Sequence, residues 1–318
     1  MSWSFTAHRG SANNKVSGAT LAVSPSGTIV AGAVLIAVCV SDNIATGGGQ
    51  TSNHVVTDFL GNSWKKIREQ SNADVAAAGI TLSVWICQLD TQILTTDSVV
   101  FGMSAAVTAK AIGLYEYAIA NGNVPAVIGS ASSEQDATTA PTVTLSNLLS
   151  QSYALFGVVG RENDTAGTYT QDTDYNDRTK FGSTGGGGAT NVSCVVGDRL
   201  ATLTSDTFAP TALSASADVA TILVTLKEVS PLKLTVSDVR QINGRVYVLW
   251  SNGEEDEYAS LADALDQRDA LLASGATTLK RLAISRYLRI DPTGSNPSIL
   301  IGHSIRYTDD LNGMVLII

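Results

Sequence analysis

Three histidines, His8, His54 and His303, are the residues best suited to acid–base chemistry, because an ordinary imidazole has a pKa of about 6.5. None of them belongs to an HExxH metal-binding pattern. The sequence also lacks the G-x-S-x-G turn that presents a nucleophilic serine. We therefore expect each histidine to be a surface residue or a hydrogen-bonded structural residue.

An acidic loop offers the best oxygen ligands for a cation. Asp172, Asp174 and Asn176 have the spacing of the first ligands of a calcium loop. Asp177 then stands where the turn glycine belongs, and Ser183 stands where a bidentate glutamate should close the site. We interpret residues 171–192 as a long exposed loop, with calcium binding as the alternative. The acidic run 254–257 is interpreted as a solvated turn.

The cysteines and glycine runs indicate no further chemistry. Cys39, Cys87 and Cys194 each lie in an apolar run, which is typical of a free, buried thiol. The glycine runs 47–49 and 185–188 lack the lysine and the strand-turn-helix setting of a phosphate-binding loop. The sequence therefore predicts no catalytic residue, no metal ligand and no cofactor.

Tryptophan side chains are candidates for stacking on a sugar ring. Trp85 lies inside an apolar strand, whereas Trp3, Trp64 and Trp250 lie near strand ends or turns. We expect all four to pack in a core or an interface, with ligand stacking as the alternative.

Charge and hydropathy exclude two classes of partner. The formal net charge is −9, with only 15% charged residues, whereas a nucleic-acid-binding surface needs clustered lysine and arginine. The longest apolar runs have about ten residues, well short of the roughly 20 that a membrane-spanning helix needs. The first residues also lack the pattern of a secretion signal. We expect no nucleic-acid binding and no membrane insertion.

The composition changes near residue 230. Of the first 230 residues 29 are charged, compared with 20 of the last 88, and the change coincides with Ser230-Pro231. A proline after a strand-like run is typical of a domain boundary. We therefore predict two domains, residues 1–230 and residues 231–318.

The first domain has the pattern of an all-β protein. Its strand candidates are separated by Gly, Asn, Asp and Ser, and no helical periodicity occurs before residue 258. The run 28–40 suits one strand buried on both faces, or two strands that meet at Ala31-Gly32. The strand candidates are 28–40, 80–89, two within 99–117, 142–145, 153–159 and 219–229. This pattern predicts a β-sandwich of the jelly-roll type.

The second domain predicts a small α+β fold. Asn243-Gly244 favours a tight β-hairpin between residues 239–242 and 245–250. Ser260 is a suitable N-cap for a helix that ends before Gly275, with leucine and alanine on one stripe. Residues 286–291, 298–301 and 314–318 predict short strands, the last of them buried.

A turn in the first domain resembles one that recurs in β-sandwich modules of tailed-bacteriophage virion proteins. Residues 56–66 have the pattern V-x-D-x-x-G-N-x-W, in which Asp58 can bond its own downstream backbone, Gly61-Asn62 can form a left-handed turn and Trp64 returns to the core. The resemblance spans most of residues 15–230, and residues 231–318 show none. Other segments similar to those modules, in the same order, are 18–28, 82–85, 109–116 and 224–228.

The resemblance implies a non-enzymatic structural protein of the virion, either a capsid decoration protein or a neck or tail accessory protein. It would be made in the host cytoplasm, would contact other virion proteins and would form a homo-oligomer. A fibre-type adhesin that binds a host receptor or glycan is the alternative, using the loop 171–190 or a shared patch of exposed rings. An enzyme such as a depolymerase is the third hypothesis. The rings in question are Trp3, Trp64, Tyr169 and Tyr175.

The second domain is our candidate anchor to the particle. Its arginines can pair with an acidic partner surface, so removal of residues 231–318 should abolish particle association and leave a folded sandwich. These arginines are Arg268, Arg281, Arg286 and Arg289.

Overall fold

The computed structural model divides the chain into two compact units, Met1–Ser230 and Pro231–Ile318. In the first unit it describes residues 2–44, 48–72, 79–163, 169–185, 190–211, 213 and 216–229. In the second unit it describes the backbone of the strands β17 Val236–Ile242, β18 Arg245–Trp250, β19 Glu255–Tyr258, β20 Arg289–Ile290, β21 Ile299–Leu300, β22 Ile305–Tyr307 and β23 Met314–Leu316.

The first unit consists of two successive lobes with the same strand pairing. The strands of the first lobe are β1 Ser4–Asn14, β2 Gly18–Val23, β3 Val34–Asp42, β4 His54–Asp58, β5 Lys65–Asn72, β6 Ile80–Gln88, β7 Val99–Val107 and β8 Lys110–Ala118. The strands of the second lobe are β9 Val124–Thr138, β10 Val143–Leu145, β11 Gln151–Arg161, β12 Asn176–Asp177, β13 Phe181–Gly182, β14 Ser193–Leu203, β15 Asp206–Phe208 and β16 Ala217–Val229.

The pairing within each lobe is nested. In the first lobe β1 pairs with β8, β2 with β7 and β3 with β6, all antiparallel. In the second lobe β9 pairs with β16, β10 with β15 and β11 with β14 in the same way. The inner sheets therefore have equivalent orders, β1-β8-β3-β6 and β9-β16-β11-β14. Each lobe is one long hairpin folded back on itself.

The strand registers allow positions in the two lobes to be matched. Val38 pairs with Val84 and Gly113, and its counterpart Val158 pairs with Val196 and Ile222. The edge strand β5 contacts β9 and β16 of the second lobe, and its counterpart β13 contacts β1 and β8 of the first. These reciprocal contacts are what a two-fold relation between the lobes requires.

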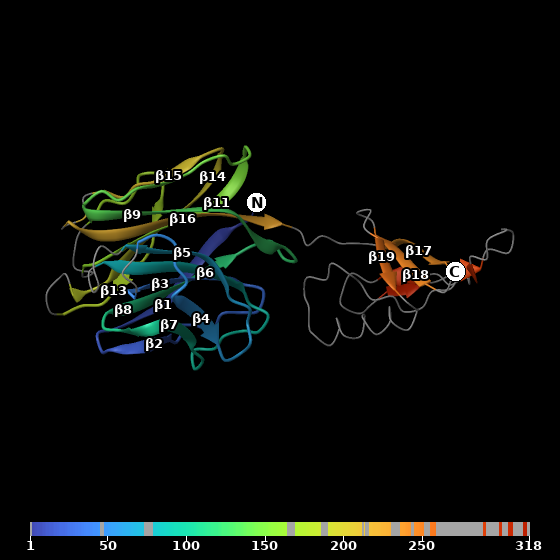
Figure 1. Ribbon diagram of the computed structural model, residues 1–318, viewed down its shortest axis with the longest axis horizontal. Helices are drawn as coiled ribbons and strands as arrows, with labels where there is room; N and C mark the ends of the chain where they lie inside the picture. The colour runs from blue at the N-terminus through green and yellow to red at the C-terminus, as the bar shows by residue number, and fades with distance from the viewer. Residues whose placement is uncertain are drawn as a thin grey trace. The chain divides into compact units, whose positions relative to one another are not determined.

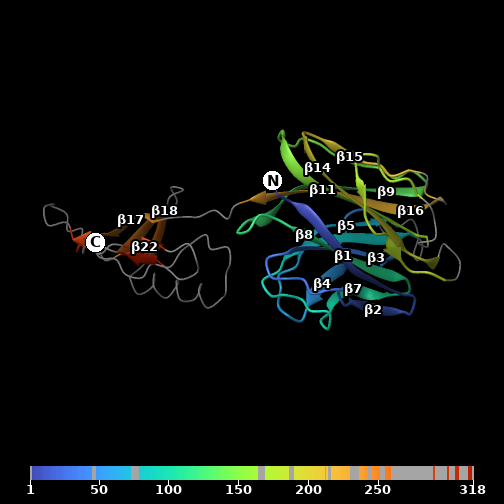
Figure 2. The ribbon, with the colours of Figure 1, turned by 180° about the vertical axis from the view of Figure 1, so that it is seen from behind.

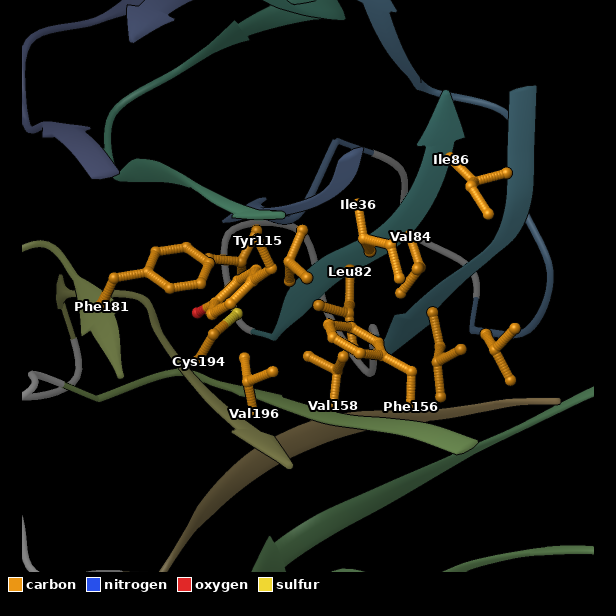
Figure 3. Close-up of a cluster of buried hydrophobic side chains, with 14 of the residues drawn as sticks. Ile36, Leu82, Val84, Ile86, Tyr115, Phe156, Val158, Phe181, Cys194 and Val196 are labelled. Carbon is orange, nitrogen blue, oxygen red and sulfur yellow. The ribbon is translucent and has the colours of Figure 1, made fainter. Parts of the chain in front are cut away.

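The lobes pack through their inner sheets, which gives the first unit four β layers (Figure 1). The outer sheet β2-β7-β4 covers the far face of the first inner sheet, and the pair β10-β15 covers part of the second. Figure 2 shows β2, β4 and β7 beside β1 and β3 from behind. In Figure 3, Leu82 and Val84 of the first lobe face Phe156 and Val158 of the second.

The strands β8, β3 and β6 in the middle of the first inner sheet are buried on both faces. Alternate residues of β3, beginning with Val34 and Ile36, join the core between the lobes, while Leu35 and Ala37 pack against the outer sheet. A strand covered on both sides reads as a continuous apolar run, which explains residues 34–40. The run 28–40 is nevertheless not a single strand, because Ile29 forms a separate bridge with Ile93 and the chain turns at Ala31-Gly32, where Gly32 has φ +86°. Of the two interpretations, the one with a break at Ala31-Gly32 agrees with the structure.

The fold is all-β throughout the described part of the chain, in antiparallel sheets, as a β-sandwich requires. The segment 171–192 differs from our prediction, because Tyr175, Phe181 and Val192 are buried in it. These side chains cover apolar surface of the second lobe and of the core between the lobes, so the described residues of this segment, 171–185 and 190–192, form a packed covering rather than a long exposed loop.

In the second unit, β17 and β18 form the predicted hairpin, with Ile242 opposite Arg245. The strands β20, β21 and β23 fall within the predicted ranges. The predicted helix from Ser260 lies outside the described residues, as does the predicted burial of the last strand, and the α+β fold has no support. None of the described segments is a helix long and apolar enough to span a membrane.

Candidate interaction surface

The turn between β4 and β5 is held by the carboxylate of Asp58. One oxygen, Oδ1, accepts hydrogen bonds from the backbone N–H of Leu60 at 2.9 Å and of Asn62 at 3.2 Å. The other, Oδ2, accepts a bond from Nε1 of Trp64 at 2.9 Å. Gly61 has φ +81°, a left-handed conformation that glycine adopts without steric cost. The role predicted for Asp58 is confirmed.

Asn62 attaches this turn to the next loop. Its Oδ1 accepts hydrogen bonds from the backbone N–H of Asp90 at 3.0 Å and of Thr91 at 2.8 Å. Trp64 packs, partly buried, against the core under the outer sheet, and Val56 is buried there. Side-chain hydrogen bonds therefore hold the backbone of this turn at several points, and we call it the rigid turn.

The rigid turn displays one large apolar side chain, Phe59, which is 87% exposed. Val30 and Leu94 are also exposed, and they follow Ile29 and Ile93, whose backbones are hydrogen-bonded to each other. The loops that carry Val30, Phe59 and Leu94 lie at the end of the first lobe where β3 begins. An exposed aromatic side chain on a hydrogen-bonded turn can serve as the anchor of a protein contact.

A cavity of about 160 Å³ opens between the inner sheets at this same end of the first unit. Its inner wall is apolar, with Ile36, Phe156 and Leu226, and Leu200 stands at its rim with 56% of its surface exposed. The other residues that line the cavity are Trp3, Ser4, Phe5, Tyr117, Ala154, Leu155, Asn176, Arg178, Asp198 and Arg199.

A hydrogen-bonded cluster holds one side of this cavity. The hydroxyl of Tyr117 donates to Asp198 at 2.7 Å, and Arg178 donates to both oxygens of Asp198, at 3.0 and 2.7 Å. The guanidinium of Arg178 also lies 3.9 Å from the ring centre of Phe5. Burial and the Asp198 carboxylate raise the pKa of Tyr117 well above its usual value. The charges are satisfied within the protein, so this side of the cavity is a preformed wall.

A second, more open hollow of about 570 Å³ lies over the segment 169–180. It is lined by Tyr169, Asp177, Arg178, Thr179 and Lys180, and the ammonium of Lys180 lies 5.8 Å from the Tyr169 ring centre. The Tyr169 hydroxyl donates to Asp177. An aromatic ring beside charged and hydroxyl groups in an open hollow suits a polar ligand such as a sugar.

The histidines lie in separate places. His54 is buried in the first lobe, where its ring nitrogens contact the hydroxyls of Ser41 at 3.0 Å and Ser83 at 2.9 Å. Burial lowers its pKa to about 4, against the opposing effect of Glu69. The pKa of His8 is also lowered by burial. His303 lies outside the described side chains. The expectation of a hydrogen-bonded structural residue is confirmed for His54.

The side chains of the acidic loop point to different partners. Asp172 accepts bonds from the backbone N–H of Asp174 and of Ala209, at 3.1 and 2.8 Å. Asp174 forms an ion pair with Arg199, and Asn176 donates to Asp198. Among the described residues no three of His, Cys, Asp and Glu lie close enough together to hold a metal ion. The residues considered for the alternative of calcium binding therefore do not converge on one site.

The four rings named for an adhesin surface do not form one patch. Trp3 lies in the core between the lobes, and Trp64 packs under the first outer sheet. Tyr175 belongs to the core of the second lobe, and Tyr169 packs against that core while partly exposed. Trp85 is buried as predicted, and the side chain of Trp250 lies outside the described residues.

The cysteines are buried free thiols, as predicted. Burial raises the pKa of Cys39 and of Cys194 well above the usual value, and that of Cys87 to about 12. All three are therefore uncharged thiols at neutral pH.

Sequence reasoning found the turn but missed the cavity. The turn is local, and its pattern spans residues 56–64. The cavity joins Phe5, Tyr117, Arg178 and Asp198, which only the packing of one lobe on the other brings together. Comparison of the chain with family models, with curated proteins and with solved structures gives no match.

Proposed function

We propose that the chain is a non-enzymatic structural component of a tailed-phage virion, acting through protein–protein contacts as a capsid decoration protein or a neck or tail accessory protein. Its partners would be other virion proteins and further copies of itself, and its location would be the virion. The observation that carries this proposal is the fixed display of Phe59 on the turn between β4 and β5.

The energetics of the turn support a contact role. An exposed phenylalanine side chain contributes no hydrophobic stabilisation while water surrounds it. Transfer of this side chain out of water into an interface is worth about 1.5–3 kcal/mol. The turn already fixes the backbone of Phe59 through Asp58, so little backbone entropy is lost when a partner covers the ring. Rigid aromatic anchors of this kind dominate the binding energy of many interfaces.

The architecture supports the same role. Nested pairing of β1 with β8, β2 with β7 and β3 with β6 is the pairing of a jelly roll, an architecture used in viral capsid and lectin domains. We infer that the first unit is a tandem of two such lobes. This inference and the resemblance of residues 56–66 to virion proteins are independent of each other.

Counting copies in purified particles tests the proposal. The tagged chain is expressed during infection by the phage that encodes it, and copies per particle are measured by quantitative mass spectrometry. We expect a fixed copy number, in the hundreds for a decoration protein, or three, six or twelve for a neck or tail protein. Phe59→Ser should reduce incorporation at least about tenfold, the effect of losing one buried ring. The matched control is Val16→Ser, which changes another exposed apolar side chain.

Recovery of the wild-type chain only outside particles would contradict the proposal. Equal incorporation of the Phe59 and Val16 variants would leave a virion protein whose contact surface lies elsewhere.

The open hollow at Tyr169 favours a second candidate, a fibre-type adhesin for a host glycan. A stacked ring contributes about 0.5–1.5 kcal/mol, so Tyr169→Ala should weaken glycan binding about two- to tenfold. Leu149→Ala, which changes another exposed side chain, is the control on a glycan array. Wild-type protein that binds no glycan on the array would contradict this candidate.

A further inference from the structure

The cavity between the lobes has the size of one aromatic ring. Its volume is about 160 Å³, close to the roughly 150 Å³ of an apolar protein cavity that binds benzene. Ile36, Phe156 and Leu226 give the cavity apolar walls, and the hydrogen-bonded cluster of Tyr117, Arg178 and Asp198 forms one side. A ring that entered would pack on the apolar side chains.

The chain also displays a matching ring. Phe59 is the most exposed of the large apolar side chains in the described residues. Its turn is bonded through Asn62 to Asp90 and Thr91, which follow the end of β6. The end of β6 pairs with Val34, at the beginning of β3, beside the Ile36 that lines the cavity. Phe59 and the cavity therefore lie at the same end of the first inner sheet.

We propose that Phe59 of one copy inserts into the cavity between the lobes of a second copy. This inference rests on the proposed function, since it names a second copy as the partner of the Phe59 surface. Phe59 and the cavity lie at the same end of the first unit. Two copies related by a two-fold axis therefore make the contact twice, with the Phe59 ring of each copy in the cavity of the other copy.

The size of the contact determines how strong it is. One aromatic side chain buries about 150–250 Å², so two such contacts fall well short of the roughly 1,000 Å² of a specific interface. Free chains therefore associate weakly, and the contact becomes strong only where a particle holds copies close together. Covalent trapping detects such a weak contact better than sedimentation does.

Cysteine pairing across the contact tests the proposal on the full chain. One preparation carries Phe59→Cys and the other carries Leu200→Cys at the cavity rim. Both positions are exposed, so neither change should impair folding, and circular dichroism checks this. The native cysteines are buried and do not compete. The two preparations are mixed with oxidised glutathione, which accepts the electrons as two thiols become one disulfide.

The ring in this mixture comes from the Leu200→Cys chain, which keeps its Phe59. When that ring enters the cavity of the Phe59→Cys chain, the two-fold pair brings the thiol at position 59 of one chain to the thiol at position 200 of the other. A Leu200→Cys chain that also carries Phe59→Ser should therefore lose the fast trapping, because neither chain then supplies a ring.

The matched control replaces Phe59→Cys by Val16→Cys. Val16 is 70% exposed and lies two residues after the end of β1, at the opposite end of the first lobe from the cavity. We expect the disulfide between the Phe59→Cys and Leu200→Cys chains to form at least about tenfold faster than the disulfide between the Val16→Cys and Leu200→Cys chains. The reason is that docking raises the effective concentration of the first pair of thiols.

Equal trapping rates for Phe59→Cys and Val16→Cys would overturn the proposal. If trapping is equal but Phe59→Ser still fails to enter particles, Phe59 engages another virion protein, and the proposed function stands without the self-contact. If trapping is fast but Phe59→Ser enters particles normally, the self-contact is real and the assigned particle-binding role of Phe59 is wrong.

Discussion

The two lobes of the first unit have the same inner sheet but cover it differently. In the first lobe a three-stranded sheet, β2-β7-β4, lies over the outer face. In the second lobe the paired strands β10 and β15 have only three residues each, and Tyr175 and Leu213 complete the cover. The nested pairing thus tolerates large changes in the outer layer, provided that the outer apolar face of the inner sheet is covered.

Equivalent positions in the two lobes show that the large aromatic ring comes from a different layer in each lobe. In the first lobe Ala37 pairs with Trp85, and the counterparts in the second lobe are Gly157 and Gly197. The ring of Phe208 lies directly over these two glycines, where an added Cβ on Gly157 would stand 2.5 Å from it. One lobe supplies the large ring from the sheet, and the other supplies it from the cover.

The largest effect should come from removal of the covering ring. Phe208→Ala empties the space over Gly157 and Gly197 and removes the contact with Tyr175, so we expect a loss of about 3–5 kcal/mol in the free energy of unfolding. Urea denaturation measures it. The exposed Phe59→Ala is the control and should change stability by less than about 0.5 kcal/mol. A loss below about 1 kcal/mol for Phe208→Ala would mean that the cover does not depend on this ring.

Acid should weaken the cover of the first lobe specifically. The folded pKa of His54 is lowered to about 4 from 6.5, so the unfolded chain binds a proton that the folded chain excludes. Stability from His54 is complete above pH 6.5 and falls as the pH drops towards 4, by at most about 3 kcal/mol. The charge of His54 and hydrogen bonds from Lys66 and Asn53 lower the pKa of Glu69 in spite of its burial, so this carboxylate stays charged over most of the range.

Denaturation curves of wild type and His54→Gln between pH 4 and 7 check this. The free energy of unfolding of the wild type should fall as the pH drops, and that of His54→Gln should not show this dependence. The His8→Gln variant should keep most of the dependence. Parallel curves for wild type and His54→Gln would contradict the assignment.

A smaller loss of stability should follow when the alanine of the first lobe is introduced at the equivalent position of the second lobe. Gly157→Ala introduces the methyl group that the equivalent Ala37 carries in the first lobe. This methyl group would lie against the Phe208 ring, and we expect the overpacking to lower the free energy of unfolding by about 1–3 kcal/mol. The double variant Gly157→Ala with Phe208→Leu should recover part of it, because the smaller side chain leaves room. Thermal and urea unfolding measure both variants. An unchanged stability for Gly157→Ala would show that Phe208 moves freely.

The smallest effect on the lobes should come from removal of residues 231–318. The first unit has its own core, so the truncated chain should unfold within about 0.5 kcal/mol of the full chain. We expect the truncated chain to be lost from particles, because the second domain is our candidate anchor. Retention on particles would mean that the first unit is the anchor, and poor folding would mean that the units are not independent.

Local signals were predictable from the sequence, and relations between distant segments were not. The apolar run of β3 and the turn at Asp58 depend on neighbouring residues, so both were predicted. The duplication was missed because it lies in the pairing rather than in residue identity: Ile86 has Asp198 as its counterpart. The burial of Tyr175 was also missed, since a polar, glycine-rich segment gives no sign that a neighbouring strand needs its ring.

The nested pairing also has a consequence for synthesis on the ribosome. Because β1 pairs with β8, the first lobe cannot close until its last strand has emerged. Its apolar inner face then waits for a second lobe of about a hundred residues, which takes roughly 5–20 s to translate. During that interval a nascent chain presents Leu82 and Val84 to solvent and to other nascent chains. Slower growth at low temperature or a chaperone that binds this face should therefore raise the yield of folded protein.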